Sequence, residues 1–170
     1  MRRKNIVLIG MMGCGKTTVG GLLAAKLNRE QIDTDALIVE REGRAISAMF
    51  AEDGEAWFRA RELDISRELA DKTDLILSCG GGLPLQRDAM AALRESGVAF
   101  WLNRDPGETY DALDVSGRPL AQEGKEAFVA RYTYRAPIYR TAAHHIIDCS
   151  RGAEAAAEDI LRILEEEGYL

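Results

Sequence analysis

Cysteine is scarce in this sequence, and its spacing matches no common structural site. The three cysteines, Cys14, Cys79 and Cys149, are odd in number, widely separated and without a Cys-x-x-Cys pair. A disulfide framework or a structural zinc site normally needs paired cysteines, so we expect neither. The pattern favours a protein that works in a reducing compartment, and we expect it to be cytoplasmic.

Long apolar runs, basic runs and low-complexity segments are also missing. No stretch is long and apolar enough to span a bilayer, and the apolar run after residues 1–4 is too short for a signal-peptide core. The net charge is −6, with 22 basic and 28 acidic residues mixed along the chain. We therefore expect neither a nucleic acid nor a membrane surface as a partner. A small anion would have to be held by a few placed cations.

What the sequence does contain is a glycine-rich loop between a predicted strand and a predicted helix. The loop Gly10-Met11-Met12-Gly13-Cys14-Gly15-Lys16-Thr17-Thr18 follows the apolar run 6–9 and leads into a helical pattern. This order predicts a P-loop, whose backbone N–H groups surround phosphate oxygens at the positive end of a helix. We expect Gly13, Cys14, Gly15 and Thr18 to contact phosphate, Lys16 to reach the β- and γ-phosphates, and Thr17 to ligate Mg²⁺.

A dinucleotide-binding turn is the alternative interpretation of this loop. Gly13 and Gly15 match the first two glycines of that motif, and Asp33 and Asp35 follow after about 20 residues, where a ribose-binding acid is expected. However, Thr18 occupies the position of the third glycine, and a Lys-Thr pair has no function in such a turn. The P-loop interpretation is therefore preferred.

The rest of the chain alternates short β-rich runs with helical patterns, which predicts a parallel sheet with helices on both faces. At 170 residues the chain should form one domain. We expect strands at 6–9, up to about 33, and at 75–78, 98–102 and 145–148. We expect helices at about 16–28, 36–42, 54–71, 86–96, 125–142 and 153–167, with a short one after 105. Segment 114–124, with a glycine near each end and a proline inside, should be a mobile loop.

Candidate site residues follow the predicted strands, and ligands of open α/β sheets bind beyond the carboxyl ends of the strands. Asp33 and Asp35 suit the water shell of Mg²⁺ and an acceptor hydroxyl, although Asp35 could instead only cap the next helix. Gly80–Gly82 after the third strand indicates close approach to a ligand or unusual backbone angles, the alternative being a flexible turn.

Three arginines complete the set of candidates. Arg59 and Glu62 share a helix face, a spacing that is also typical of a weak surface ion pair. Arg118 lies in segment 114–124, where a closing lid could place it on the transferring phosphoryl group. Arg135 lies between aromatic residues late in a helix, and spacing alone does not distinguish it from a surface cation.

Together these segments resemble the shikimate kinase family. The P-loop alone is generic, and the resemblance rests on the ordered combination of motifs. These are the P-loop 10–20, Asp-Thr-Asp at 33–35, Trp-x-Arg-x-Arg-Glu at 57–62, Gly-Gly-Gly at 80–82, Gly-Arg-Pro-Leu at 117–120 and Arg-Ala-Pro-Ile-Tyr at 135–139.

The resemblance implies a three-layer α/β P-loop fold in one domain, 1–170, with a five-stranded parallel sheet in the order 2-3-1-4-5. It implies an acceptor-binding segment at about 34–62 and a lid at about 114–124. The implied activity is transfer of the ATP γ-phosphate to the 3-hydroxyl of shikimate, with Mg²⁺ as the cofactor. Shikimate and ATP would be the partners of a monomeric enzyme.

Residue by residue, the resemblance implies shikimate contacts from Asp35, Arg59, Gly80, Gly81, Gly82 and Arg135, with Glu62 orienting Arg59. It implies Mg²⁺ ligation through Thr17, Asp33 and Ser78, and transition-state stabilisation by Lys16 and Arg118. Asp35 would orient the acceptor hydroxyl and is the candidate base.

The sequence departs from the family where the nucleotide base should bind. Family members often carry an arginine shortly before the lid, whereas 108–113 contains none. Tyr110 or Arg151 is the candidate to cover the base instead. Two other functions remain open alternatives: another small-metabolite kinase, such as a gluconate kinase, and a nucleotide-binding regulatory module without turnover.

Overall fold

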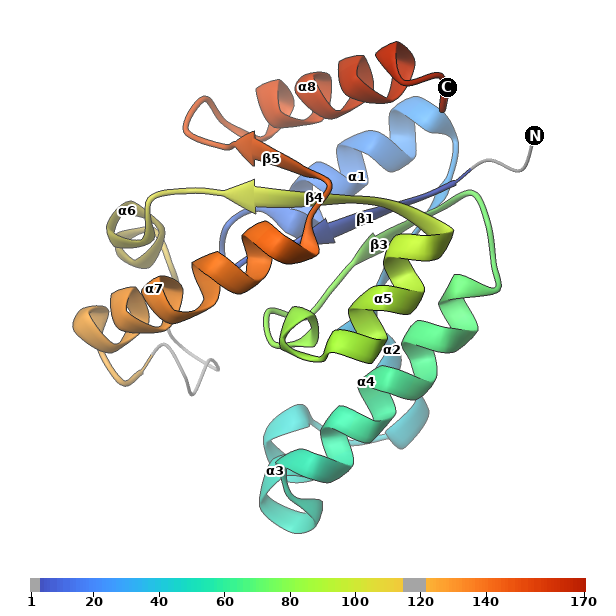
Figure 1. Ribbon diagram of the computed structural model, residues 1–170. Helices are drawn as coiled ribbons and strands as arrows, with labels where there is room; N and C mark the ends of the chain where they lie inside the picture. Colours follow the sequence, from blue (N-terminus) through green and yellow to red (C-terminus); the bar gives the residue numbers. More distant parts are fainter. Residues whose placement is uncertain (1–3, 115–121) are drawn as a thin grey trace.

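Five parallel strands form the centre of the molecule, in the order β2-β3-β1-β4-β5 (Figure 1). The computed structural model describes residues 4–114 and 122–170. The strands are β1 (Asn5–Ile9), β2 (Glu30–Asp33), β3 (Leu75–Ser78), β4 (Gly97–Asn103) and β5 (His145–Asp148). The predicted sheet and its strand order are therefore confirmed.

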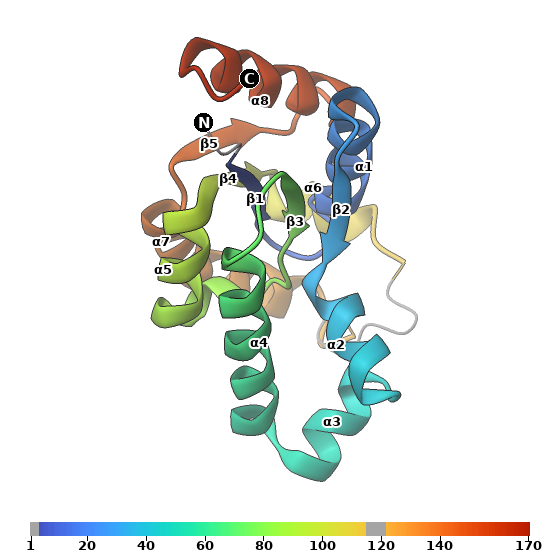
Figure 2. The same cartoon turned by 90° about the vertical axis from the view of Figure 1, so that its right-hand side faces the viewer.

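Helices cover both faces of this sheet (Figures 1 and 2). They are α1 (Lys16–Leu27), α2 (Thr34–Glu42), α3 (Ile46–Asp53), α4 (Glu55–Ala70), α5 (Arg87–Ser96), α6 (Pro106–Asp111), α7 (Lys125–Ala142) and α8 (Ala153–Glu166), with a 3₁₀ turn at Leu83–Leu85. Helices α1 and α8 pack on one face, and α4, α5 and α7 pack on the other. In the part of the chain that the structure describes, no helix is both long and apolar enough to cross a membrane.

Strand β1 shows why the sequences of the strands are continuous apolar runs. Its side chains point alternately to the two faces: Ile6 and Leu8 pack with α1 and α8, while Val7 and Ile9 pack with α4, α5 and α7. All four side chains are buried. A strand that is covered on both faces has no polar side, so its sequence shows no alternation of polar and apolar residues.

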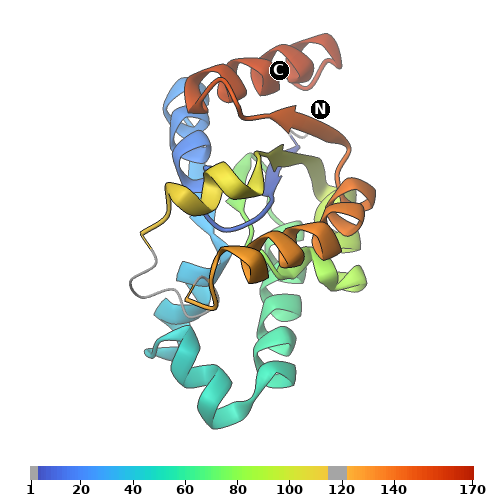
Figure 3. The ribbon, with the colours of Figure 1, turned by 90° about the vertical axis from the view of Figure 1, so that its left-hand side faces the viewer.

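Helices α2 and α3 and the first part of α4 form a separate lobe beside the sheet (Figure 2). A small cluster of Ile38, Met49, Phe58 and Ile65 holds this lobe together. Helix α3 was not predicted from the sequence. Helix α6 packs against α7 (Figure 3).

The start of α2 corrects one of the sequence interpretations. The helix begins at Thr34, earlier than the predicted residue 36, and Asp33 is its N-cap: Oδ1 of Asp33 accepts a 2.9 Å hydrogen bond from the backbone N–H of Ala36. The alternative that Asp35 merely caps this helix is therefore wrong. Asp35 lies in the first turn, with its side chain free for another task.

Candidate active site

The loop after β1 has the backbone that its glycines predict. Gly10, Gly13 and Gly15 have φ values of +147°, +77° and +107°, which a residue with a side chain adopts only under strain. Gly10 is also crowded, because a Cβ there would lie 2.8 Å from Cys14 Sγ and 2.8 Å from the Leu102 carbonyl oxygen. The side chain of Cys14 belongs to the core, and its backbone N–H donates a 3.2 Å hydrogen bond to the Met11 carbonyl.

Lys16 folds back over this loop. Its ammonium donates hydrogen bonds to the carbonyl oxygens of Gly10 and Met11, at 2.8 and 2.9 Å. Thr17 and Thr18 are exposed in the first turn of α1, and Gly15 gives that turn no side-chain cap. The first N–H groups of α1 are thus available to an anion, with a lysine beside them.

The glycines after β3 are required by their neighbours and not by their own backbone angles. None of Gly80–Gly82 has a positive φ. A Cβ on Gly80 would lie 2.8 Å from Cγ of Asp35, and one on Gly82 would lie 2.6 Å from both Nη atoms of Arg59. Two of the predicted site residues, Asp35 and Arg59, therefore approach these glycines closely, whereas close approach to a ligand stays a prediction.

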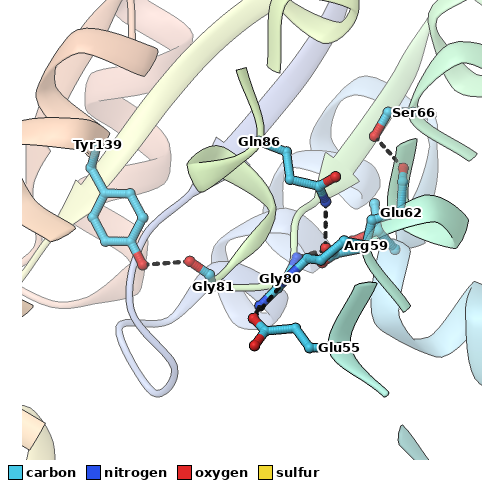
Figure 4. Close-up of polar contacts among 9 residues, drawn as sticks. Glu55, Arg59, Glu62, Ser66, Gly80, Gly81, Gln86 and Tyr139 are labelled. Atoms are coloured by element: carbon cyan, nitrogen blue, oxygen red, sulfur yellow. Dashed lines mark hydrogen bonds and ion pairs between the residues drawn. The ribbon is translucent and has the colours of Figure 1, made fainter. Parts of the chain in front are cut away.

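Helix α7 reaches the same glycines from another side. The hydroxyl of Tyr139 donates a 2.7 Å hydrogen bond to the Gly81 carbonyl (Figure 4). Burial raises the pKa of Tyr139 to about 12, against the opposing charge of Arg135, so its hydroxyl stays a donor. Nη1 of Arg135 lies 3.4 Å from the position of a Cβ on Gly81.

Arg135 is a buried cation whose charge is not matched. It is 8% exposed, and it forms no ion pair with a carboxylate anywhere in residues 4–114 and 122–170. Surface cations on a helix are solvated, so the interpretation of Arg135 as a surface residue is wrong. Burying an unpaired charge is unfavourable, which makes this position suited to an anionic ligand.

Arg59 is held by an ion pair that is not a surface pair. Nη1 of Arg59 lies 2.6 Å from Oε2 of Glu62, and Nε2 of Gln86 donates a 2.6 Å hydrogen bond to the same oxygen (Figure 4). Burial raises the pKa of Glu62, despite the opposing effects of Arg59 and Gln86. Burial alone would lower the pKa of Arg59, but the bonds and charges of Glu62 and Glu55 outweigh it, and the pKa is raised.

Asp35 is a half-buried carboxylate, and no residue of the described chain donates a hydrogen bond to it. Burial raises its pKa first, and the charge of Asp33 raises it further, while Lys16 and Arg59 partly oppose this. A carboxylate with a raised pKa and no internal donor is suited to accept a hydrogen bond, and then a proton, from a ligand hydroxyl.

The predicted metal residues lie at the ends of α1, β2 and β3. Asp33 and Ser78 are register partners on neighbouring strands. The Ser78 hydroxyl accepts a 3.1 Å hydrogen bond from Nε2 of Gln31 and lies 3.3 Å from the Lys16 carbonyl, to which it donates. No group of three or more His, Cys, Asp or Glu side chains in the described segments could hold a metal ion. The donor set fits Mg²⁺, which proteins bind through few side chains together with substrate phosphates.

The two candidates for the nucleotide base differ in their surroundings. The ring of Tyr110 packs on Phe128 at 5.6 Å and joins the core, so stacking on a base would remove it from that contact. Arg151 is exposed after β5 and pairs with Asp159. Arg151 is thus the better placed of the two. Arg118 and most of segment 114–124 lie outside the described residues.

A phosphate loop on a sheet of this order, facing two arginines and a carboxylate, defines a P-loop kinase. The family model described as shikimate kinase matches residues 12–165. A shikimate kinase of Pelotomaculum thermopropionicum is 39% identical over 170 residues, covering 98% of this chain and 99% of the relative. One of Nitrosomonas europaea is 40% identical and covers 95% of this chain and 79% of the relative. The chain belongs to the shikimate kinase family.

Solved structures agree with this assignment. The shikimate kinase of Acinetobacter baumannii in complex with shikimate superposes with a TM-score of 0.89 at 34% identity, covering 96% of this chain and 94% of the other. That of Aquifex aeolicus gives a TM-score of 0.85 at 30% identity, covering 96% and 98%. A gluconokinase of Sinorhizobium meliloti gives 0.54 at 17% identity, covering 98% and 97%, a likeness of fold alone. The gluconate kinase alternative is not favoured.

Proposed function

We propose that this protein transfers the γ-phosphoryl group of ATP to the 3-hydroxyl of shikimate, giving shikimate 3-phosphate and ADP, through the residues assigned below. Its membership of the shikimate kinase family supports the reaction. The observation that carries the residue assignment is the packing of Asp35, Arg59 and Arg135 against the consecutive glycines 80–82.

The acceptor is bound by complementary charge. Shikimate carries one carboxylate and three hydroxyls, and the two arginines bind the carboxylate through charge-assisted hydrogen bonds. Glu62 keeps the Arg59 guanidinium in place, and Asp35 accepts from the hydroxyls. The backbone of Gly80, Gly81 and Gly82 lines the acceptor. The acceptor-binding segment is 34–62, which contains α2, α3 and the start of α4.

The nucleotide is bound by the loop before α1. Backbone N–H groups of Gly13, Gly15 and Thr18 contact its phosphates, and so does that of Cys14 once it leaves the Met11 carbonyl. Lys16 exchanges the carbonyls of Gly10 and Met11 for the β- and γ-phosphates. Arg151 contacts the base. This exchange is possible because Lys16 bonds to the neutral carbonyls of Gly10 and Met11, which are weaker partners than phosphate.

Thr17 would hold Mg²⁺ through its hydroxyl, with Asp33 holding the water shell and Ser78 beside them. Mg²⁺ neutralises charge on the β- and γ-phosphates when it is bound. Asp33 uses one carboxylate oxygen to cap α2, which leaves the other oxygen for this task.

The reaction needs positioning and charge neutralisation more than covalent catalysis. Asp35 orients the 3-hydroxyl and takes its proton as the oxygen bonds to the γ-phosphorus, while the bond from that phosphorus to the β–γ bridging oxygen breaks and ADP leaves. Lys16 and Arg118 stabilise the negative charge that develops on the transferred group. Arg118 acts from the lid, 114–124, and an arginine in this role contributes on the order of 10³–10⁵ in rate in related enzymes.

We propose a monomeric enzyme of one domain, 1–170. The unpaired cysteines support a reducing compartment, so we place the enzyme in the cytoplasm. Its partners are shikimate and ATP. Neither a nucleic acid nor a membrane is required by any of these contacts.

The test is ADP release from Mg-ATP, with shikimate, gluconate and nucleoside monophosphates offered separately. We expect turnover with shikimate alone. Turnover with a different acceptor would keep the P-loop chemistry and overturn the roles of Arg59 and Arg135. ATP binding without turnover of any acceptor would identify a regulatory module instead.

A further inference from the structure

Gln31, which the sequence analysis did not single out, connects β2 to the first turn of α1. Its side-chain Nε2 donates two hydrogen bonds of 3.1 Å, one to the backbone carbonyl of Thr17 and one to the hydroxyl of Ser78. These bonds join three elements that are far apart in the sequence: α1, β2 and β3. The Gln31 amide thus links the sheet to the helix turn that carries Lys16 and Thr17.

The close approach of Gln31 accounts for a glycine inside α1. Gly20 is an interior helix position, where glycine is less favourable than alanine by about 1 kcal/mol. A Cβ on Gly20 would collide with the Gln31 amide, lying 2.9 Å from its Cδ and closer still to Nε2. The next residue, Gly21, has room, since its Cβ would lie 3.6 Å from Oε1 of Gln31.

Ser78 extends the network to a second carbonyl of the same turn. Its hydroxyl accepts from Gln31 and donates to the Lys16 carbonyl at 3.3 Å. The consecutive carbonyls of Lys16 and Thr17 therefore each receive a side-chain hydrogen bond from the sheet, in addition to the helix's own bonds. Because Ser78 has one proton, the Gln31 donor determines which way that hydroxyl points.

We propose that Gln31 is a positioning residue for the metal–nucleotide site, acting through the Thr17 carbonyl and through Ser78. The inference rests on the proposed function, because it takes Lys16 and Thr17 as the phosphate and metal contacts. Gln31 holds the turn from which both side chains project. Ser78 supports the same turn through the Lys16 carbonyl, and its contribution to metal binding depends on the Gln31 amide.

The test is Gln31→Leu, which keeps a similar volume and removes both donors. Calorimetry should show Mg-ADP binding about tenfold more weakly, the size of effect typical of groups that orient metal ligands. ADP binding in EDTA should change less. In turnover, the KM for Mg-ATP should rise while the KM for shikimate stays the same, because the hydrogen bonds of the Gln31 amide go to Thr17 and Ser78.

Two matched controls distinguish positioning from general stability. Glu30→Leu makes an apolar change at the neighbouring residue of β2, which is exposed and has no side-chain partner among residues 4–114 and 122–170, and it should leave Mg-ADP binding unchanged. Gly20→Ala should weaken Mg-ADP binding like Gln31→Leu, because its Cβ displaces the Gln31 amide and lies 3.1 Å from Ser78 Oγ, so that it disrupts the hydrogen bond between the two. Gly21→Ala should not. The comparison of Gly20→Ala with Gly21→Ala still tests the positioning role of Gln31 if Gln31→Leu fails to fold.

The proposal is overturned if Gln31→Leu and Gly20→Ala lower the melting temperature but bind Mg-ADP as the wild type does. Gln31 would then be a packing residue only. A failure of the proposed function looks different: the wild type itself would bind Mg-ADP without turning over shikimate. Wild type that binds no nucleotide would overturn both.

Discussion

The Arg59 guanidinium lies 2.6 Å from Oε2 of Glu62, a carboxylate whose side chain is 1% exposed. A second carboxylate, Glu55, reaches the same arginine at 3.2 Å, but its side chain is 66% exposed. Exposed ion pairs contribute little, whereas removing one partner of a buried pair leaves an uncompensated group. The orientation of Arg59 therefore depends on Glu62 and not on Glu55.

Glu62→Gln should raise the KM for shikimate about tenfold, because the ion pair with Arg59 becomes a weaker hydrogen bond between the guanidinium and a neutral amide, and Arg59 loses its orientation. The KM for Mg-ATP should not change. Glu55→Gln is the matched control on the same helix and should alter the shikimate KM less than twofold, as expected of an exposed pair worth about 0–1 kcal/mol. Equal effects of the two changes would contradict this account.

Arg135→Met should raise the KM for shikimate by about tenfold to a hundredfold, since it removes a charge-assisted contact to the acceptor carboxylate and keeps much of the buried volume. The kcat should fall less. Steady-state kinetics with shikimate as the varied substrate measures both. Arg140→Met, at an exposed position of the same helix, is the control and should leave the shikimate KM near that of the wild type. An unchanged KM in Arg135→Met would remove Arg135 from the acceptor site.

The sheet could be predicted from the sequence because its strands are buried on both faces. Runs such as 6–9 and 75–78 are apolar throughout, and this signal needs no knowledge of distant residues. Helix α3 could not be predicted in this way. Its burial depends on a small cluster with α2 and α4, and only Met49 of α3 is fully buried, so little apolar periodicity marks it.

The sequence points to candidate site residues where they belong to a recognisable motif, and it does not point to their hydrogen-bonding neighbours outside the motifs. Arg135 could be ranked above a surface cation only through the family resemblance, because its burial depends on the packing of α7 onto the sheet. Gln31 and Gln86 belong to none of the motifs. Each acts through hydrogen bonds to residues at least 14 positions away, and no local pattern signals such contacts.

Asp35→Asn should stabilise the free enzyme while it lowers kcat by about 10²-fold or more, the usual contribution of a general base. Burial, followed by the charge of Asp33, raises the pKa of Asp35, so the ionised form is disfavoured in the folded state. The penalty is absent below the unfolded-state pKa of 3.8 and complete above the raised folded pKa. The gain in melting temperature should therefore be largest at neutral pH and should vanish as the pH falls towards 3.8.

Thermal unfolding of Asp35→Asn and wild type across this pH range measures the effect. Glu40→Gln removes a carboxylate from an exposed position of the same helix and should give no comparable, pH-dependent gain. A loss of stability in Asp35→Asn at neutral pH would show that the carboxylate has an internal partner that stabilises its charge.

Alanine at each of the three glycines after β3 should give three different results. None of them has a positive φ, so the backbone tolerates alanine and the fold should persist. Gly82→Ala should raise the shikimate KM about tenfold, because its Cβ lies 2.6 Å from the Arg59 guanidinium and displaces it. Gly80→Ala should instead lower kcat by about 10²-fold, because it moves Asp35, and a shift of about 1 Å can have that effect.

Gly81→Ala is the internal control for this series. Its nearest neighbours would lie at 3.4 and 3.5 Å, close to ordinary contact, so it should change each kinetic constant least. Steady-state kinetics with each substrate varied, together with melting temperatures, separates displacement of a side chain from loss of the fold. Equal effects from all three alanines would mean that the glycines serve the backbone itself, and that the contacts of Asp35 and Arg59 with them do not determine acceptor binding.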